Sequence, residues 1–389
     1  MRVISRTVWI LSAVSLLTDT ASEMLYPIMP VYLKSIGFSI ILIGILEGIA
    51  EATAGLSKGY FGKLSDVTGK RVPFVQLGYA LSTLSKPMMA VFTYPLWIFF
   101  SRTLDRLGKG IRTGARDALL SDEATHETKG RVFGFHRSMD TFGAAIGPAL
   151  ALLYLYFYPE DYITLFYIAF IPGLFAIALS FLLKEKKRVA HEKTKVSFFA
   201  SFGYWKNSPA AYKKLVLGLL VFTLFNSSDM FLLLQAKQSG LSDAGVIGIY
   251  IFYNLIYALF AFPMGILADK IGLKTIFVFG IFIFSGVYFG MAFMNSFYGF
   301  MFLFFLYGIY AAATEGISKA LITNITDKKE TATAIGTFTG FQSIFAMLAS
   351  TLAGVIWYFT NAETTFVITA GVSLAVAFYF IFSIRHIND

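Results

Sequence analysis

Twelve long apolar stretches limit what this chain can fold into. In lipid every backbone amide needs an internal hydrogen-bond partner, so a stretch of about 20 apolar residues crosses a membrane as a helix. A transmembrane barrel would instead show segments of about ten residues with alternating polarity, a pattern that this sequence lacks. The stretches are residues 8–33, 40–61, 73–94, 96–118, 132–157, 162–183, 213–236, 244–265, 273–294, 297–322, 332–358 and 364–384. We therefore predict an all-α membrane protein with twelve transmembrane helices.

The composition agrees with this prediction. Of the 389 residues, 57% are apolar and only 14% are charged, against roughly 45–50% and about 25% in soluble domains. The absence of cysteine from the sequence excludes disulfides, iron–sulfur clusters and thiol chemistry. No Ser-His-Asp order, metal-ligand spacing or phosphate loop indicates an enzyme. We expect neither an enzymatic activity nor a cofactor, with a proton as the coupling ion.

The distribution of Lys and Arg predicts the orientation in the membrane. Basic residues collect at both termini and in the loops after the second, fourth, eighth and tenth stretches, whereas the alternate loops hold almost none. The positive-inside rule then places both termini in the cytoplasm, in a cell (inner) membrane. The net charge of +9 is explained by this orientation, so we expect contacts with membrane lipids and none with nucleic acid.

An internal repeat divides the chain into two halves. Ser-Glu-Met at 22–24 resembles Ser-Asp-Met at 228–230, and Gly-Phe-His at 134–136 resembles Gly-Phe-Gln at 340–342, with the same shift along the sequence. Such repeats are typical of transporters. We predict six-helix bundles over residues 1–183 and 213–389, joined by a basic cytoplasmic linker at 184–212. The linker is expected to lie on anionic headgroups, and a role in regulation or partner docking is the alternative.

A similar decapeptide follows the second and the eighth stretch. It reads GKLSDVTGKR from Gly62 and GILADKIGLK from Gly265. Glycines allow a tight turn between helices, and the carboxylate can bind a helix N-terminus or nearby cations. Both copies resemble the G-x-L-a-D-r-x-G-r-k signature of the major facilitator superfamily. The resemblance implies that Asp66 and Arg71 latch the cytoplasmic side in the outward-open state. The gating residues are then Gly62, Asp66, Gly69, Arg71, Gly265 and Asp269.

The fifth stretch carries regularly spaced glycines and a proline. They are Gly134, Gly143, Gly147 and Pro148. This spacing resembles the motif G-x8-G-x3-G-P-x2-G of proton-driven exporters in the superfamily, with Ala151 in place of the last glycine. The resemblance implies a proton-coupled antiporter. Ordinary small-residue helix packing with a proline kink is the alternative interpretation.

Ionisable residues inside the predicted spans indicate where a proton could bind. Each costs at least about 2.5–3.5 kcal/mol to insert, so a function is the first hypothesis. Neighbouring carboxylates on one face of the first span suit a group that takes up and releases protons. The candidates for proton coupling are Asp19, Glu23, Asp105, Arg106 and Asp140. Arg106 also resembles the arginine of the superfamily's R-x-x-q-G element. The alternative is that these residues form salt bridges that only hold helices together.

Other polar residues within the spans are candidates for the substrate cavity. In the superfamily, spans one, four, seven and ten line this cavity, and the candidates are Arg102, Arg137, Asn226, Asp229, Asn254 and Glu315. Arg112 and Arg116 lie near the end of the fourth span and are expected to snorkel to the headgroups. His136 is interpreted as an interior histidine with its hydrogen bonds satisfied.

These observations predict a secondary active transporter, a proton-coupled antiporter that exports a small organic molecule by alternating access and acts as a monomer. The closest alternative is a proton symporter or facilitator for an anionic metabolite, because the buried arginines could bind a carboxylate or phosphate. Two further alternatives remain open. One is a divalent-metal exporter that uses Asp19, Glu23, His136 and Asp140 as ligands, and the other is a lipid flippase.

Overall fold

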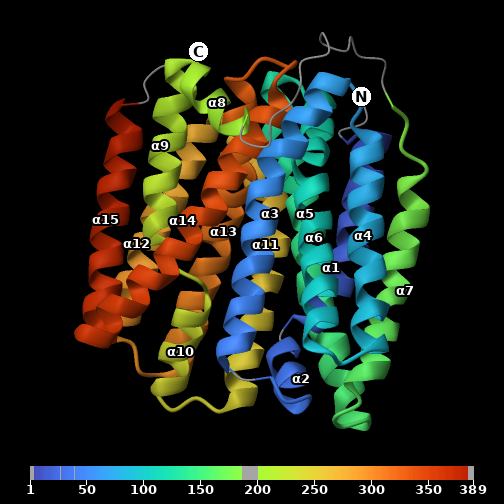
Figure 1. Ribbon diagram of the computed structural model, residues 1–389. Helices are drawn as coiled ribbons and strands as arrows, with labels where there is room; N and C mark the ends of the chain where they lie inside the picture. Colours follow the sequence, from blue (N-terminus) through green and yellow to red (C-terminus); the bar gives the residue numbers. More distant parts are fainter. Residues whose placement is uncertain (1–3, 27, 39, 186–199, 384–389) are drawn as a thin grey trace. The chain divides into compact units, whose positions relative to one another are not determined.

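The computed structural model describes residues 4–26, 28–38, 40–185 and 200–383 (Figure 1). Every regular element in this part of the chain is a helix. Nine of its helices are long and apolar enough to cross a membrane. The all-α membrane class is confirmed, whereas the count of twelve spans stays a prediction. Residues 186–199 of the predicted linker lie outside the described residues.

The helices follow the predicted stretches closely. The first seven are α1 (Arg6–Leu25), α2 (Met29–Ser35), α3 (Ile40–Thr68), α4 (Val72–Val91), α5 (Pro95–Asp122), α6 (Lys129–Phe157) and α7 (Tyr162–Ser180), with the 3₁₀ turn η1 (His126–Thr128) before α6. The others are α8 (Ala200–Asn207), α9 (Ala210–Phe225), α10 (Met230–Gln238), α11 (Asp243–Ile271), α12 (Leu273–Phe293), α13 (Phe297–Asn324), α14 (Thr331–Phe359) and α15 (Ala362–Ser383). Each predicted stretch corresponds to one helix, except the first and the seventh, which are each broken into two.

The two breaks occur where the sequence disfavours a helix. Between α1 and α2 stands Pro27, which has no backbone N–H for the helical ladder. Between α9 and α10 stands Asn-Ser-Ser-Asp at 226–229, whose short polar side chains compete for backbone hydrogen bonds. Backbone that leaves the helix at membrane depth is tolerated where protein or a water-filled cavity surrounds it. The broken spans therefore mark places of interest for function.

The contacts divide the chain into two compact units. The first unit comprises residues 1–123, 139–207 and 327–343, and the second comprises 124–138, 208–326 and 344–389. Helices α6 and α14 each contribute residues to both units. The units therefore differ from the two sequence halves, because the first turns of α6 and of α14 are each grouped with residues of the other half.

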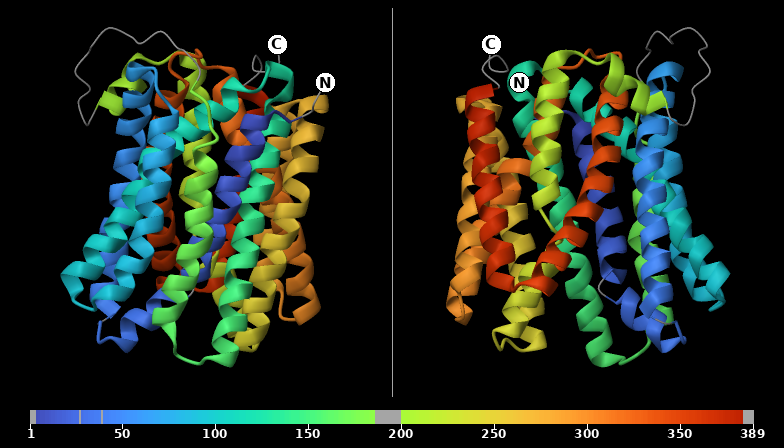
Figure 2. Two further views of the ribbon diagram at one scale, coloured as in Figure 1. Left: turned by 90° about the vertical axis from the view of Figure 1, so that its right-hand side faces the viewer. Right: turned by 60° about the vertical axis from the view of Figure 1, so that its left-hand side comes forward.

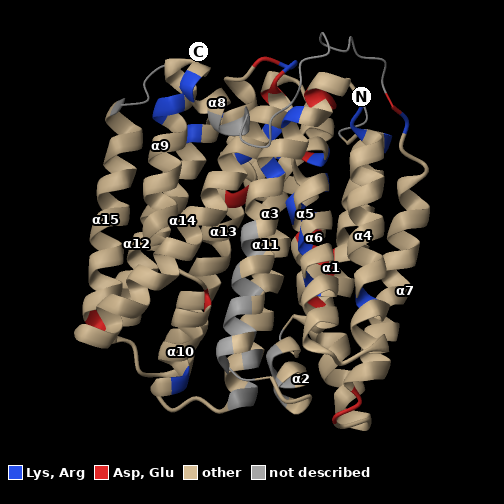
Figure 3. Cartoon of the chain, in the orientation of Figure 1, with Lys and Arg blue, Asp and Glu red and all other residues tan. Residues whose placement is uncertain are grey.

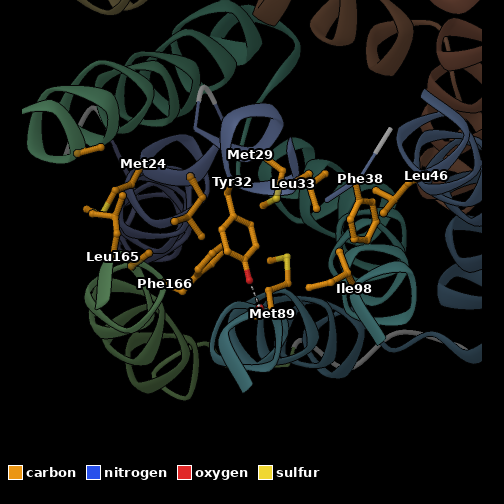
Figure 4. Packing of buried hydrophobic residues seen from close by; sticks show 13 residues of the cluster. Met24, Met29, Tyr32, Leu33, Phe38, Leu46, Met89, Ile98, Leu165 and Phe166 are labelled. Carbon is orange, nitrogen blue, oxygen red and sulfur yellow. Dashed lines mark hydrogen bonds between the residues drawn. The ribbon is translucent and has the colours of Figure 1, made fainter. Parts of the chain in front are cut away.

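In the first unit, α4 packs against α5 and α7, α3 packs against α5, and α1 packs against α7 (Figures 1 and 2). A buried apolar cluster holds the short α2 in place (Figure 4). Tyr32 of α2 stands edge-on to Phe166 of α7 at 4.9 Å between ring centroids, and its hydroxyl donates to the Met89 carbonyl of α4 at 3.1 Å. In a membrane protein such side chains hold helices together by van der Waals packing, since lipid tails are as apolar as they are. Ala151 of α6 belongs to this cluster, which explains a methyl group in place of the motif's last glycine.

In the second unit, α13 packs against both α11 and α12, α12 packs against α15, and α15 packs against α9 (Figure 2). Its interior is rich in aromatic rings: Tyr307 of α13 lies 5.0 Å from Tyr253 of α11 and 5.2 Å from Tyr310, ring centroid to centroid. Phenol oxygens bring hydrogen-bonding groups into this otherwise apolar core.

Candidate functional site

Helix α5 carries charge along much of its length, whereas α7 in the same unit is almost free of it between its ends (Figure 3). The buried charged residues of α5 are Arg102, Asp105, Arg106, Arg112, Arg116 and Asp117. Charges so deep in a membrane helix require partners. Two cations meet Asp105: the Lys86 ammonium of α4 at 3.6 Å and the Arg102 guanidinium at 3.7 Å. The predicted cavity residue Arg102 is therefore engaged within the chain.

The glycines of α6 bring this helix directly against the backbone of α1. A Cβ atom added at Gly143 would lie 2.4 Å from the Leu16 carbonyl oxygen, and one at Gly147 would lie 2.6 Å from the Thr20 carbonyl oxygen. Such distances are far below ordinary contacts, so only glycine permits this approach. Pro148 follows inside the helix. Gly134 allows a close approach to α11 instead, because a Cβ added there would lie 2.6 Å from the Ala261 carbonyl oxygen, within the second unit.

This close approach joins the carboxyl groups of α1 and α6. The Ser15 hydroxyl of α1 donates to the Asp140 carboxylate of α6. Asp19, one turn further along α1, has its Cβ 3.2 Å from the position of a Cβ at Gly143. Glu23 lies one turn beyond Asp19, near Lys109 and Arg106 of α5. The structure therefore brings three of the predicted proton-coupling carboxyl groups into one cluster.

Arg116 and Arg112 do not reach the headgroups, and that prediction is wrong. Arg116 is 8% exposed; its Nε lies 2.9 Å from Asp117 Oδ1 and its Nη1 lies 4.0 Å from Asp140 Oδ1. Arg112 is also buried, where it donates to the Ser82 hydroxyl at 2.7 Å and lies over the Tyr79 ring. Their places near the end of the helix suggested snorkelling, but neighbouring helices supply partners that the sequence position alone did not reveal.

Asp66 binds the start of α14, within the first unit. Its Oδ2 accepts hydrogen bonds from the Thr333 amide and hydroxyl, both at 2.7 Å, and Arg71 Nη2 lies 3.4 Å from Oδ1. Arg71 also lies 3.5 Å from Asp122 of α5 and donates to the Lys328 carbonyl. The turn glycine Gly69 has φ +64°, and a Cβ at Gly62 would lie 2.4 Å from the Ala332 carbonyl oxygen. We call Asp66, Arg71, Asp122 and Thr333 the first latch.

Asp66 lies beyond the end of the predicted span 40–61, and its environment perturbs its ionisation. Burial raises the pKa of this carboxyl to about 6 from its ordinary value of 3.8. The Arg71 guanidinium and the hydrogen bonds from Thr333 oppose part of this effect. Removal from water disfavours the charged form more than these partners favour it.

Asp269 makes the corresponding contact in the second unit. It accepts from the amides of Gly130 and Arg131, at 2.7 and 3.0 Å, and from Arg131 Nε at 2.8 Å. A Cβ at Gly265 would lie 2.3 Å from the Gly130 carbonyl oxygen. Asp269, Gly130 and Arg131 form the second latch. Each motif aspartate therefore binds the first turn of a helix from the other sequence half, where the helix dipole favours a negative charge.

The remaining cavity candidates lie in the second unit. Asp229, at the break before α10, accepts from the Tyr307 hydroxyl at 2.7 Å, and Asn226 donates to the Tyr310 hydroxyl at 2.8 Å. Asn254 is buried and donates to the Tyr250 carbonyl one turn earlier. The structure thus surrounds the break in the seventh span with phenol groups.

Arg137 and Glu315 form an ion pair at 3.2 Å with about a third of each side chain exposed. Arg137 also donates to the Tyr257 hydroxyl. His136 is 4% exposed. Within the described ranges, no three His, Asp or Glu side chains converge closely enough to hold a metal ion.

Sequence reasoning missed several contributors. Asp117 is fully buried beside Arg116, and a carboxylate directly before Ala118-Leu119-Leu120 was a usable signal for it. Ser15 and Thr333 gave no comparable signal, because a single hydroxyl in an apolar helix is common. Glu185 accepts from the Arg71 and Val72 amides at 2.9 and 2.7 Å and so caps α4.

Comparisons with known proteins agree on the architecture. The family model described as Major Facilitator Superfamily matches residues 11–255 and 233–388. An uncharacterised MFS-type transporter of Methanocaldococcus jannaschii is 34% identical over 371 residues, which cover 94% of this chain and 92% of that protein.

Solved structures share the fold at low sequence identity. The human organic anion transporter MFSD10 superposes with a TM-score of 0.81 at 14% identity, over 96% of this chain and 99% of that one. The fucose:proton symporter FucP of E. coli gives 0.78 at 13% identity, over 96% and 98%. At this identity the likeness concerns the fold alone.

Proposed function

The chain belongs to the Major Facilitator Superfamily, and from this premise we propose that it is a proton-coupled antiporter that exports a small organic molecule. A transporter of this family is not an enzyme. The observation that carries the proposal is the carboxyl cluster of Asp19, Glu23 and Asp140, which the α6 glycines hold against α1. A carboxyl group inside a membrane protein can take up a proton and release it in exchange for substrate.

The cluster suits proton exchange because its charges are not fixed in one-to-one pairs. Glu23 lies near Arg106 and Lys109, and Asp140 lies near Asp19 and Arg116. Loss of a proton from one carboxyl therefore changes the partners of the others. In this proposal the proton is the only coupling ion and no other cofactor takes part.

The two latches suit alternating access. In each latch one aspartate binds the first turn of a helix, so a few hydrogen bonds hold or release the two helices that it joins. We place both termini and the latches on the cytoplasmic side of the cell (inner) membrane, as the loop charges predict. Export then requires the latches to open when substrate is loaded and to close when it leaves. The protein is proposed to act as a monomer in contact with membrane lipids.

A facilitator for an anionic metabolite is the second candidate. Lys109 favours it, because this lysine is exposed in the middle of α5 between two buried glycines. The contacts of Arg102 with Asp105 and of Arg137 with Glu315 weigh against it, since both guanidinium groups already meet a carboxylate.

The test is proton movement in proteoliposomes that contain an internal pH dye. Lipophilic cations, sugars, organic anions and divalent metals are added in turn, with a proton gradient and without one. We expect one class to trigger proton movement in the native protein, and Glu23→Gln to abolish it. Glu363→Gln is the matched control, because Glu363 is exposed in the first turn of α15.

Equal transport with and without a proton gradient would refute antiport. Transport of an organic anion without proton movement, lost in a Lys109→Gln variant, would support the second candidate instead.

A further inference from the structure

The ion pair of Arg137 and Glu315 in the second unit is a feature to which the proposed function assigns no role. Arg137 Nη2 lies 3.2 Å from Glu315 Oε2, and 30% and 33% of the two side chains are exposed. The helices that carry them, α6 and α13, are both long and apolar enough to cross a membrane. Exposed charges in such helices face water or the bundle interior rather than lipid tails. The ion pair therefore meets water inside the protein.

The ion pair lies well away from the helix ends. The Lys129 ammonium donates to the Thr323 carbonyl at 2.6 Å, so the start of α6 meets the end of α13. Arg137 follows Lys129 by eight residues, and Glu315 precedes Asn324 by nine. At a rise of 1.5 Å per residue, each charge stands about 12–14 Å along its helix from these ends. This depth approaches the middle of a hydrocarbon layer of about 30 Å.

Tyr257 of α11 holds one edge of the Arg137 guanidinium. Its hydroxyl oxygen accepts from Arg137 Nε, and the guanidinium carbon lies 5.5 Å from the centroid of its ring. Tyr257 is itself buried, with 4% of its surface exposed. The contact with Glu315 is made by Nη2, at the other end of the guanidinium. Arg137 is therefore positioned by α11, while its contact with Glu315 involves two partly exposed groups.

A row of phenol rings runs along α11 beside the ion pair. Tyr250, Tyr253 and Tyr257 are three and four residues apart, which places them on one face of the helix. Neighbouring rings in this row lie 6.3 Å apart, centroid to centroid, and Tyr250 is partly exposed. Aromatic rings offer flat apolar contact area together with a polar hydroxyl. A ligand held at the ion pair thus has aromatic rings beside it.

A singly charged ligand must separate this pair in order to bind. A cation that binds Glu315 takes it from Arg137, and an anion that binds Arg137 takes it from Glu315. Such separation is unfavourable, because opposite charges attract strongly where bulk water is excluded. A zwitterion replaces both partners at once: its carboxylate takes the place of Glu315 beside the guanidinium, and its ammonium takes the place of the guanidinium beside Glu315. Each charge keeps a partner of opposite sign, and a guanidinium can bind a carboxylate through two hydrogen bonds.

We propose that Arg137 and Glu315 bind the exported substrate, and that this substrate is a small zwitterion with an apolar side group, of the kind found in aromatic amino acids and short peptides. Arg137 binds its carboxylate, Glu315 binds its ammonium, and the apolar group lies against the rings of Tyr250 and Tyr253. Without substrate the two residues neutralise each other, as the structure shows. The inference rests on the proposed function, because it names the substrate class of that transporter.

The test is isothermal titration calorimetry of the full chain in detergent at neutral pH, which measures binding without a proton gradient. The probes are phenylalanine, phenylalaninamide and N-acetylphenylalanine, which share one ring and carry both charges, only the positive charge and only the negative charge. The same three forms of the dipeptide of two phenylalanines extend the series to a wider charge separation. We expect the zwitterion of at least one series to bind about tenfold or more tightly than both of its singly charged forms, because each missing charge removes a charge-assisted hydrogen bond.

Two variants connect each residue with one charge of the ligand. Glu315→Gln should weaken binding of the zwitterion about tenfold or more without weakening that of the N-acetyl form, and Arg137→Gln should do so without weakening that of the amide. A purely structural ion pair would instead affect all three forms alike. Arg137→Lys and Glu315→Asp keep the charges and should keep the preference for the zwitterion, which separates binding from misfolding. Glu363→Gln, at an exposed position of α15, is the matched control and should leave all affinities unchanged.

Equal affinities for the three forms in both series, no binding of either zwitterion, or a preference that survives both Glu315→Gln and Arg137→Gln would overturn the inference. None of these results touches antiport, which the proteoliposome measurement tests with other classes of compound. Conversely, a zwitterion that binds through both residues and crosses the membrane without proton movement would refute antiport and leave this assignment of the binding residues standing.

Discussion

Replacing Gly143 with alanine should separate α1 from α6 and so break the carboxyl cluster. The added methyl would lie 2.4 Å from the Leu16 carbonyl oxygen, 2.9 Å from the Thr20 amide nitrogen and 3.2 Å from Asp19 Cβ. The first two neighbours are helix backbone, which cannot rotate away as a side chain could. The helices must therefore move apart by about 1 Å, and such overpacking destabilises by about 1–3 kcal/mol.

The intrinsic preference of alanine for helix offsets up to about 1 kcal/mol of this loss. Gly286→Ala isolates that preference, because a Cβ at Gly286 in α12 meets no described atom within 4 Å. Gly286→Ala should thus be neutral or stabilising by up to about 1 kcal/mol. The two variants should differ by about 1–3 kcal/mol, with Gly143→Ala the less stable.

Two measurements check this reasoning. Thermal unfolding in detergent, followed by tryptophan fluorescence, compares the stabilities of Gly143→Ala and Gly286→Ala. Proton movement in proteoliposomes compares the coupling of the two variants. In Gly143→Ala the hydrogen bond from Ser15 to Asp140 is lost, which costs about 1.5–3 kcal/mol. The rate of coupled proton movement should therefore fall about tenfold or more. If Gly143→Ala unfolds and transports like Gly286→Ala, the close approach of α1 and α6 does not position the carboxyl groups.

Three further perturbations test single contacts. Because burial raises the pKa of Asp66 from 3.8 to about 6, its contribution to stability is complete below its unfolded value and is lost as pH rises through about 6. Between about pH 4 and pH 7 the free energy of unfolding of the native protein should therefore fall by roughly 3 kcal/mol relative to that of Asp66→Asn. The same pH dependence of unfolding in both proteins would contradict this. Tyr307→Phe removes a donor to Asp229 and should destabilise by about 1–3 kcal/mol in thermal unfolding; an unchanged midpoint would show that this bond contributes nothing. Glu185→Ala leaves two amides of α4 without their acceptor and should destabilise by about 0.5–2 kcal/mol, whereas Glu185→Gln, which keeps an acceptor oxygen, should lose less.

The sequence predicted the helices and the latch aspartates because both depend on local information. A run of apolar residues determines a membrane helix, and the decapeptides place a turn and a carboxylate within ten residues. The partners of Asp66 and Asp269 were beyond this reasoning, since Thr333 and Gly130 lie far away in the sequence and contribute backbone amides. A backbone amide leaves no signal in residue identity.

Arg116 shows why depth along a helix is an insufficient guide. Counting residues from the helix end gives the distance to the headgroups but not the direction of the side chain or the identity of its neighbours. Besides Asp117 of the same helix, its partners include Asp140 and Ser15, which lie on other helices. The break in the seventh span was missed for a related reason: Asn226 and Asp229 were assigned to a cavity by polarity, while their low helix propensity was left unused.

Because each latch aspartate binds main-chain amides, that part of each latch does not depend on the identity of the residue that supplies the amide. The amides of Thr333 and Arg131 remain whichever residue stands there, provided that it keeps its N–H. Proline is the exception, since it has none. Gly130 is different, because a Cβ there would lie 2.6 Å from Asp269 Oδ1 and 2.5 Å from the Gly265 carbonyl oxygen. Related chains can thus vary at Thr333 and Arg131 and keep these amide contacts, while the aspartates cannot vary. A search for the gate by sequence comparison would find only half of it.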